Sequence, residues 1–113
     1  MSFGLSQPHH ALLAELIARH LPAGAEVLVY GSRAKGTHTP RSDLDLVIKS
    51  APADRHALAQ LREAIEDSDF PHLCDLQYYE EIQNPALKAH IDRRARPLET
   101  SAPQPLAEKQ PGQ

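Results

Sequence analysis

The chain has 113 residues, enough for one domain rather than two, and 41% of them are hydrophobic, an ordinary share for a globular protein. Its 15 Asp and Glu outnumber 12 Lys and Arg, and the net charge of −3 argues against a stable complex with nucleic acid, which needs a dense basic surface. The single cysteine, Cys74, excludes an internal disulfide, and no apolar run or secretory signal indicates a membrane partner, so a soluble cytoplasmic protein is expected.

The first expected element is a helix that starts at Ser6, with Pro8 in its first turn, because both residues are favoured at helix N-termini. Pro22 and Gly24 end this helix. Apolar residues recur along it with helical spacing and mark its buried face: Leu12, Leu13, Leu16, Ile17 and Leu21.

A buried strand is predicted next, at residues 27–30, where two valines and a tyrosine form a continuous apolar run. Gly31 ends this strand. Residues 32–35 suit a short helix that Gly36 stops, and residues 37–42 form a polar turn.

The second half begins with a strand at residues 43–48, which alternates at its start and then turns apolar. A second long helix is expected to open at Ser50 and Pro52. A third strand, at residues 73–79, follows it.

The last predicted helix runs from Glu80 to about Arg94, with an interruption at Pro85. The composition changes at Pro97, where a segment rich in proline and glutamine begins that cannot bury enough apolar surface to offset its chain entropy. We therefore predict one domain over residues 1–96 and a disordered tail over residues 97–113. The order of elements predicts an α/β (α+β) domain, with a short mixed sheet of three or more strands flanked by helices.

Two aspartates in the second strand carry the first chemical signal. Asp43 and Asp45 stand two residues apart, so on a strand they point to the same face, roughly 6.5–7 Å apart. Their mutual repulsion is relieved by a divalent cation, and hard oxygen ligands suit Mg²⁺. Taken alone, such a pair also fits an exposed sheet edge.

The turn after the first strand offers a second signal. Gly31 lets backbone come close to a ligand, and the N–H groups of such a turn, with the Ser32 hydroxyl, form a cradle for an anion. Arg33 and Lys35 add positive charge nearby. By itself this stretch also fits an ordinary Gly-Ser turn.

The third strand supplies one more carboxylate. If Leu76 faces the core helices as Leu44 does, Asp75 emerges on the face of Asp43 and Asp45. Three clustered carboxylates can hold two Mg²⁺ ions. A half-exposed edge position is the alternative reading of Asp75. The seven histidines show no zinc-type spacing around Cys74.

The segment GSRAKG…SDLDLVI resembles the signature of the DNA polymerase β-like nucleotidyltransferase superfamily: glycine, serine, ten residues, then Asp-x-Asp. It is especially similar to the minimal nucleotidyltransferases, small prokaryotic proteins of about this length. The resemblance covers Leu12 to about Arg94. It implies that Gly31 and Ser32 bind the triphosphate and that Asp43 and Asp45 are metal ligands.

By the same resemblance, Asp75 matches the third carboxylate by strand position, either as a metal ligand or as the general base. Arg33, Lys35 and Ser42 are further expected to contact the nucleotide. Lys35 stands where many relatives have arginine, a change that keeps the charge but loses the planar fork.

The reaction implied is Mg²⁺-dependent transfer of AMP from ATP to a hydroxyl. Minimal nucleotidyltransferases are paired with a HEPN-domain ribonuclease toxin, in some cases adding AMP to its tyrosine. The resemblance therefore implies an antitoxin that forms a hetero-oligomer with such a toxin. Two alternatives are a small-molecule nucleotidyltransferase of the antibiotic-modifying kind and a non-catalytic antitoxin that acts by contact alone. The cluster of Arg93, Arg94 and Arg96 fits either a helix C-terminus or a surface that contacts a partner or nucleic acid.

Overall fold

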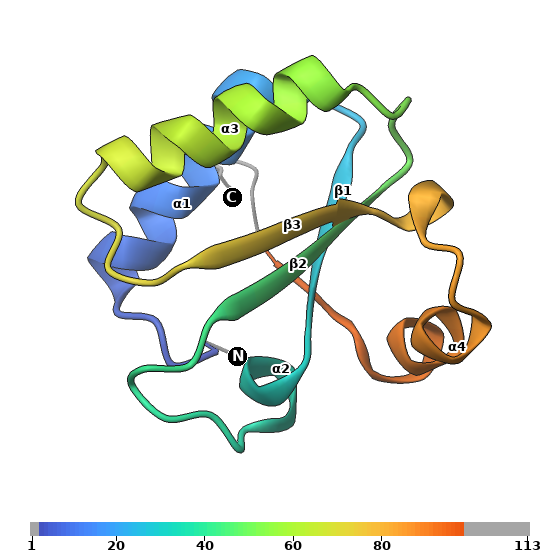
Figure 1. Ribbon diagram of the computed structural model, residues 1–113. Coiled ribbons are helices and arrows are strands. Elements are labelled where there is room, and N and C mark those ends of the chain that lie inside the picture. The colour runs from blue at the N-terminus through green and yellow to red at the C-terminus, as the bar shows by residue number, and fades with distance from the viewer. Residues whose placement is uncertain (1–2, 99–113) are drawn as a thin grey trace, which may run out of the picture.

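A four-stranded mixed sheet forms the centre of the molecule in the computed structural model, which describes residues 3–98. The strands are β1 (Glu26–Tyr30), β2 (Leu44–Lys49), β3 (Cys74–Tyr78) and β4 (Arg96–Pro97), in the spatial order β3-β2-β1-β4. β1 pairs antiparallel with both β2 and β4, whereas β2 and β3 run parallel. The expected mixed sheet with flanking helices is confirmed (Figure 1).

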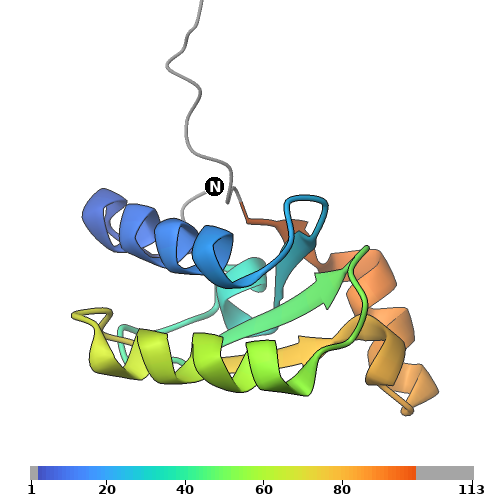
Figure 2. The ribbon, with the colours of Figure 1, turned by 90° about the horizontal axis from the view of Figure 1, so that it is seen from above.

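Two long helices, α1 (Gln7–His20) and α3 (Arg55–Asp67), lie side by side on one face of the sheet (Figure 2). They begin at side-chain caps, where Ser6 accepts a hydrogen bond from the His9 N–H and Asp54 accepts one from the Ala57 N–H. The start of α3 differs from the expected opening at Ser50 and Pro52, because the cap lies at Asp54.

The main core fills the space between these helices and the sheet. Alternate strand residues point into it, and the most buried include Val29, Leu44, Leu46, Ile48 and Leu76. The intervening strand residues therefore face the opposite side of the sheet.

That opposite side is only partly covered. The 3-10 turn η1 (Tyr79–Glu81) leads to α4 (Pro85–Arg94), which Asn84 caps by accepting from the Ala86 and Leu87 N–H groups. A second, smaller core lies between α4 and the sheet and consists of Tyr30, Val47, Ile82 and Ile91.

The chain end of the described region extends further than expected. Pro97 was predicted to open a disordered tail, but it belongs to β4 and pairs with Leu28. The Leu98 side chain is only 4% exposed, and its N–H donates to the Val27 carbonyl at 2.8 Å. The packed domain thus reaches at least Leu98, and the rest of the predicted tail lies outside the described residues.

Candidate active site

The strand register brings the carboxylates of two strands together. Asp45 of β2 lies opposite Asp75 of β3 and, on its other side, opposite Tyr30 of β1. Asp43 precedes Asp45 by two residues, just before β2 begins. Because Leu44 faces the main core, Asp45 and Asp75 face away from α1 and α3, on the side that α4 only partly covers.

The electrostatics of Asp45 reflect this crowding. Burial raises the pKa of its carboxyl group above the usual value, and the negative charges of Asp75 and Asp43 raise it further. Burial and the charges of Asp75 and Asp45 likewise raise the pKa of Tyr30. A site that disfavours its own negative charge in this way is relieved by a bound cation.

Gly31 joins the carboxylates to the turn after β1. Its backbone has φ +78° and ψ −155°, a combination that is essentially restricted to glycine. A Cβ at this position would run into the Asp45 carboxylate oxygen Oδ2. The turn backbone therefore lies directly against the carboxylate, and Ser32 begins the short helix α2 (Ser32–Lys35) beside it.

One neighbouring pair was not anticipated from the sequence. The Tyr30 hydroxyl accepts a hydrogen bond of 2.7 Å from Gln77 Nε2, so its own proton is available to another acceptor. The signal was present in the alternation: Tyr30 and Gln77 occupy the same sheet face as Asp45 and Asp75. Their hydrogen bond joins β1 to β3 on the face that carries the carboxylates.

Arg33 does not face the site, contrary to expectation. Its side chain is 1% exposed, and its guanidinium donates to backbone carbonyls of other segments, including Ser42 O at 3.0 and 3.1 Å. Ser42 is likewise engaged within its loop, because its hydroxyl accepts from the Thr39 N–H at 2.9 Å. Lys35 is exposed at the end of α2. The burial of Arg33 argues against a contact of its guanidinium with a nucleotide, whereas the contacts expected of Ser42 and Lys35 stay predictions.

The donor set suits a hard cation. In the part of the chain that the structure describes, no three His, Cys, Asp or Glu side chains stand close enough to enclose a metal ion. The raised pKa of Asp45 and the Gly31 backbone against its carboxylate nevertheless fit a divalent cation bound by oxygen ligands. Asp43 and Asp75, the two carboxylates whose charges act on Asp45, are both exposed.

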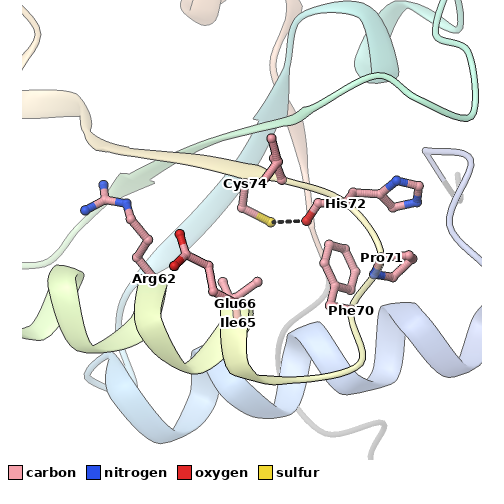
Figure 3. Close-up of a pocket in the computed structure, with 8 residues that line it drawn as sticks. Arg62, Ile65, Glu66, Phe70, Pro71, His72 and Cys74 are labelled. Carbon is pink, nitrogen blue, oxygen red and sulfur yellow. Dashed lines mark hydrogen bonds between the residues drawn. The ribbon is translucent and has the colours of Figure 1, made fainter.

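A hollow of about 190 Å³ lies elsewhere, between α3 and the start of β3. Ile65, Phe70, Pro71 and Cys74 line it, and the Cys74 thiol points toward the His72 carbonyl at 4.0 Å (Figure 3). Burial raises the pKa of Cys74 to about 12, which makes it an inert thiol. Because Cys74 and Asp75 alternate along β3, this hollow and the carboxylates lie on opposite faces of the sheet.

Comparisons with known proteins agree with this geometry. Residues 11–97 match the family model of the nucleotidyltransferase domain. A probable protein adenylyltransferase, MntA, from Haemophilus influenzae is 38% identical over 65 residues, which are 57% of each chain, so this chain spans little more than half of that relative.

A solved structure shares the fold. It is a crystal structure of a toxin–antitoxin with AMP-PNP, with a TM-score of 0.64 and 18% sequence identity, covering 80% of this chain and 72% of the other. None of the helices within residues 3–98 is long and apolar enough to cross a membrane. The family model matches most of this chain, and the glycine turn and the paired aspartates lie within the matched residues. The chain therefore belongs to the nucleotidyltransferase domain family.

Proposed function

We propose that this protein transfers AMP from ATP to a hydroxyl, most simply that of a tyrosine, on a HEPN-domain ribonuclease toxin and thereby acts as its antitoxin. The observation that carries the proposal is the juxtaposition of Asp45 and Asp75 across β2 and β3, with the Gly31 backbone against Asp45. The similarity to a protein adenylyltransferase, and to the fold of a structure from a toxin–antitoxin with AMP-PNP, supports the choice of a protein acceptor.

The reaction forms a bond between the acceptor oxygen and the α-phosphorus of ATP. The bond from that phosphorus to the bridging oxygen of the β-phosphate breaks, and pyrophosphate leaves. The backbone at Gly31 and the Ser32 hydroxyl bind the triphosphate, with exposed Lys35 as a further cation for it. Asp75 takes up the acceptor proton or helps to hold the metal beside it.

Asp43, Asp45 and Asp75 would hold magnesium in this scheme. Bound Mg²⁺, as two ions, would neutralise the triphosphate and lower the pKa of the acceptor hydroxyl. The carboxylates supply the fixed negative charge, and Asp45 lies directly against the Gly31 backbone that would bind the triphosphate. We further propose that the toxin and this chain form a hetero-oligomer in the cytoplasm, where ATP and Mg²⁺ are available.

Metal dependence is tested by calorimetry of ATP binding with and without Mg²⁺. We expect measurable affinity only with the cation, because the carboxylates repel a bare polyphosphate. Equal affinity in both conditions would remove the metal site from the proposal.

The transfer itself is tested with ATP labelled in turn at the α- and γ-phosphates, incubated with Mg²⁺ and a HEPN-domain ribonuclease as the proposed partner. Label from the α-position alone should appear on the partner, and it should disappear when Asp43 and Asp45 are both replaced by asparagine. Label from the γ-position on the partner, or label that survives the double replacement, would contradict the proposal. Transfer to an aminoglycoside-type small molecule instead would favour the antibiotic-modifying alternative.

A further inference from the structure

Arg33 is the largest side chain that the described part of the fold buries completely. It follows Ser32 directly and is 1% exposed, yet it makes no ion pair with a carboxylate within residues 3–98. A buried charge of this kind is costly unless several hydrogen bonds compensate it. The contacts of Arg33 therefore show which parts of the fold the buried guanidinium holds together.

The strongest contact is a fork on one carbonyl. Arg33 Nε and Nη2 both donate to the Ser42 carbonyl oxygen, at 3.1 and 3.0 Å. Ser42 immediately precedes Asp43. Arg33, which follows the Gly31–Ser32 turn, thus holds Ser42, the residue directly before Asp43.

The remaining donors reach other segments. Nη1 donates to the Phe3 carbonyl at 2.9 Å, and Nη2 lies 3.5 Å from the Thr39 carbonyl and 3.2 Å from His72 Nδ1. Phe3 precedes α1, Thr39 lies in the loop before β2, and His72 precedes β3 by two residues. One guanidinium therefore connects the N-terminal segment, the loop before β2 and the segment before β3.

The N-terminal residues Phe3 and Gly4 pack directly against the Arg33 guanidinium. Phe3 adopts φ +56° and Gly4 φ +77°, and a Cβ on Gly4 would lie 2.8 Å from Arg33 Nη1 and run into the His38 ring. The left-handed conformation at Phe3 is unusual for a bulky residue. The Phe3 carbonyl accepts from the guanidinium, so the unusual backbone conformation and the Arg33 contact occur at the same residue.

We propose that Arg33 is a positioning residue, which holds the loop of residues 39–42 so that Asp43 and Asp45 meet the Gly31–Ser32 turn before metal and nucleotide arrive. The role assigned to Arg33 rests on the proposed function, but the measurements below do not depend on that function. Lysine keeps the charge and loses the planar fork, so Arg33→Lys separates the two properties.

Two control variants accompany Arg33→Lys. Leu61 is 0% exposed on α3 in the main core, and Leu61→Ala lowers stability by opening a cavity there without touching the loop. Arg19 lies near the end of α1, where its exposed side chain pairs with Glu15 at 2.7 Å, and Arg19→Lys repeats the chemical change outside the site.

Amide hydrogen exchange is the first measurement, made at a temperature where every variant is folded. The Thr39 N–H donates to Ser42 Oγ at 2.9 Å and the Ser42 N–H to the Thr39 carbonyl at 3.0 Å, so both amides report on the loop. In Arg33→Lys they should exchange about tenfold faster, while amides of α3 are unchanged. In Leu61→Ala the amides of α3 should accelerate instead.

Affinity for Mn²⁺, measured by calorimetry without nucleotide, is the second readout. It should fall roughly 10–100-fold in Arg33→Lys, as for other groups that orient metal ligands, and stay unchanged in Leu61→Ala and Arg19→Lys. Loop exchange and Mn²⁺ affinity equal to wild type in Arg33→Lys would overturn the proposal. So would an equal loss of affinity in Leu61→Ala, since it would trace the effect to stability alone.

Wild-type protein provides a test if Arg33→Lys does not fold. A loop held by Arg33 should show the Thr39 and Ser42 amides protected before any cation is added, with less than about a twofold gain on adding Mn²⁺. Protection that develops only with the cation would show that the metal orders the loop and would overturn the proposal. None of these measurements needs transfer activity, so a failed transfer assay would refute the proposed function and leave this inference standing.

Discussion

Gly31 is the residue at which the turn after β1 lies against the Asp45 carboxylate. Replacing it by alanine adds a clash with Asp45 to a backbone conformation that alanine disfavours. Two other glycines separate these causes: Gly36 has φ +82° but open space around it, and Gly24 has neither strain nor neighbours within 4 Å. The three positions form a graded series.

We expect Gly24→Ala to leave the free energy of unfolding nearly unchanged and Gly36→Ala to lower it by about 1–2 kcal/mol. Gly31→Ala should lower it further and should also abolish Mg²⁺-dependent ATP binding. Urea unfolding and calorimetry measure the two effects. Normal ATP binding by folded Gly31→Ala protein would show that the turn does not approach the nucleotide.

His72 gives the fold a dependence on pH. Burial, followed by the charge of Arg33 and the nearby His9 and His38, lowers the pKa of His72 below its ordinary value of 6.5. As pH falls below about 6.5 the unfolded chain binds a proton that the folded chain still excludes, so the stability due to neutral His72 is full above that pH. It is lost as the pH falls from there through the lowered pKa of the folded state.

We therefore predict that the free energy of unfolding decreases more steeply between pH 7 and pH 5 in wild type than in His72→Asn. The asparagine oxygen can still accept from Arg33 but does not titrate. Urea unfolding at several pH values provides the comparison. Parallel pH profiles for the two proteins would mean that His72 does not titrate differently on folding.

The sequence predicted the carboxylates better than the cations. Asp43 and Asp45 share a face because strand geometry fixes the direction of alternate side chains, so their spacing was sufficient. Arg33 was assigned to the nucleotide because it follows Ser32, and nothing local shows that its guanidinium turns inward to Ser42. The direction of a long side chain depends on which distant carbonyls need donors, and that is a property of the tertiary fold.

At the level of elements, local chemistry located most boundaries. Helix α2 ends at Gly36 as expected, since glycine adopts the left-handed conformation there. The start of α3 moved to Arg55 because Asp54, rather than Ser50, supplies the capping oxygen. Strand β4 was not predicted, because it has only two residues, one of them Pro97, and so carries no periodic pattern.

Leu98 shows what this short strand contributes. A chain that ends at Ala95 loses β4 and the burial of Leu98, and we expect its free energy of unfolding to fall by about 2–5 kcal/mol. A chain that ends at Leu98 removes only a segment poor in large apolar residues and should lose less than about 0.5 kcal/mol.

Thermal or urea unfolding of both truncated chains tests this boundary, with Leu98→Ala in the full chain as the control for side-chain burial alone. A large loss of stability in the chain that ends at Leu98 would show that residues 99–113 pack on the domain. Equal stability of both truncations would contradict the packing of Leu98.

At the scale of the whole molecule, the main core and the carboxylates lie on opposite faces of the sheet. One face carries the main core with α1 and α3, and the other carries the carboxylates beside a smaller core under α4. Replacing Asp43 and Asp45 by asparagine should therefore leave folding intact, and relief of repulsion should even favour the metal-free fold slightly. Binding of a partner over a broad surface should also survive this change.

The most direct test of catalysis combines mass spectrometry with cell survival for wild type and the Asp43→Asn, Asp45→Asn double variant, each produced with the HEPN-domain toxin proposed as the partner. We predict that the partner from wild-type cells carries one or more adenylyl groups and that cells survive. The double variant should co-purify with an unmodified partner and fail to protect at low expression. Full protection by the double variant, with an unmodified partner beside the wild-type protein, would contradict the catalytic account and establish inhibition by contact alone.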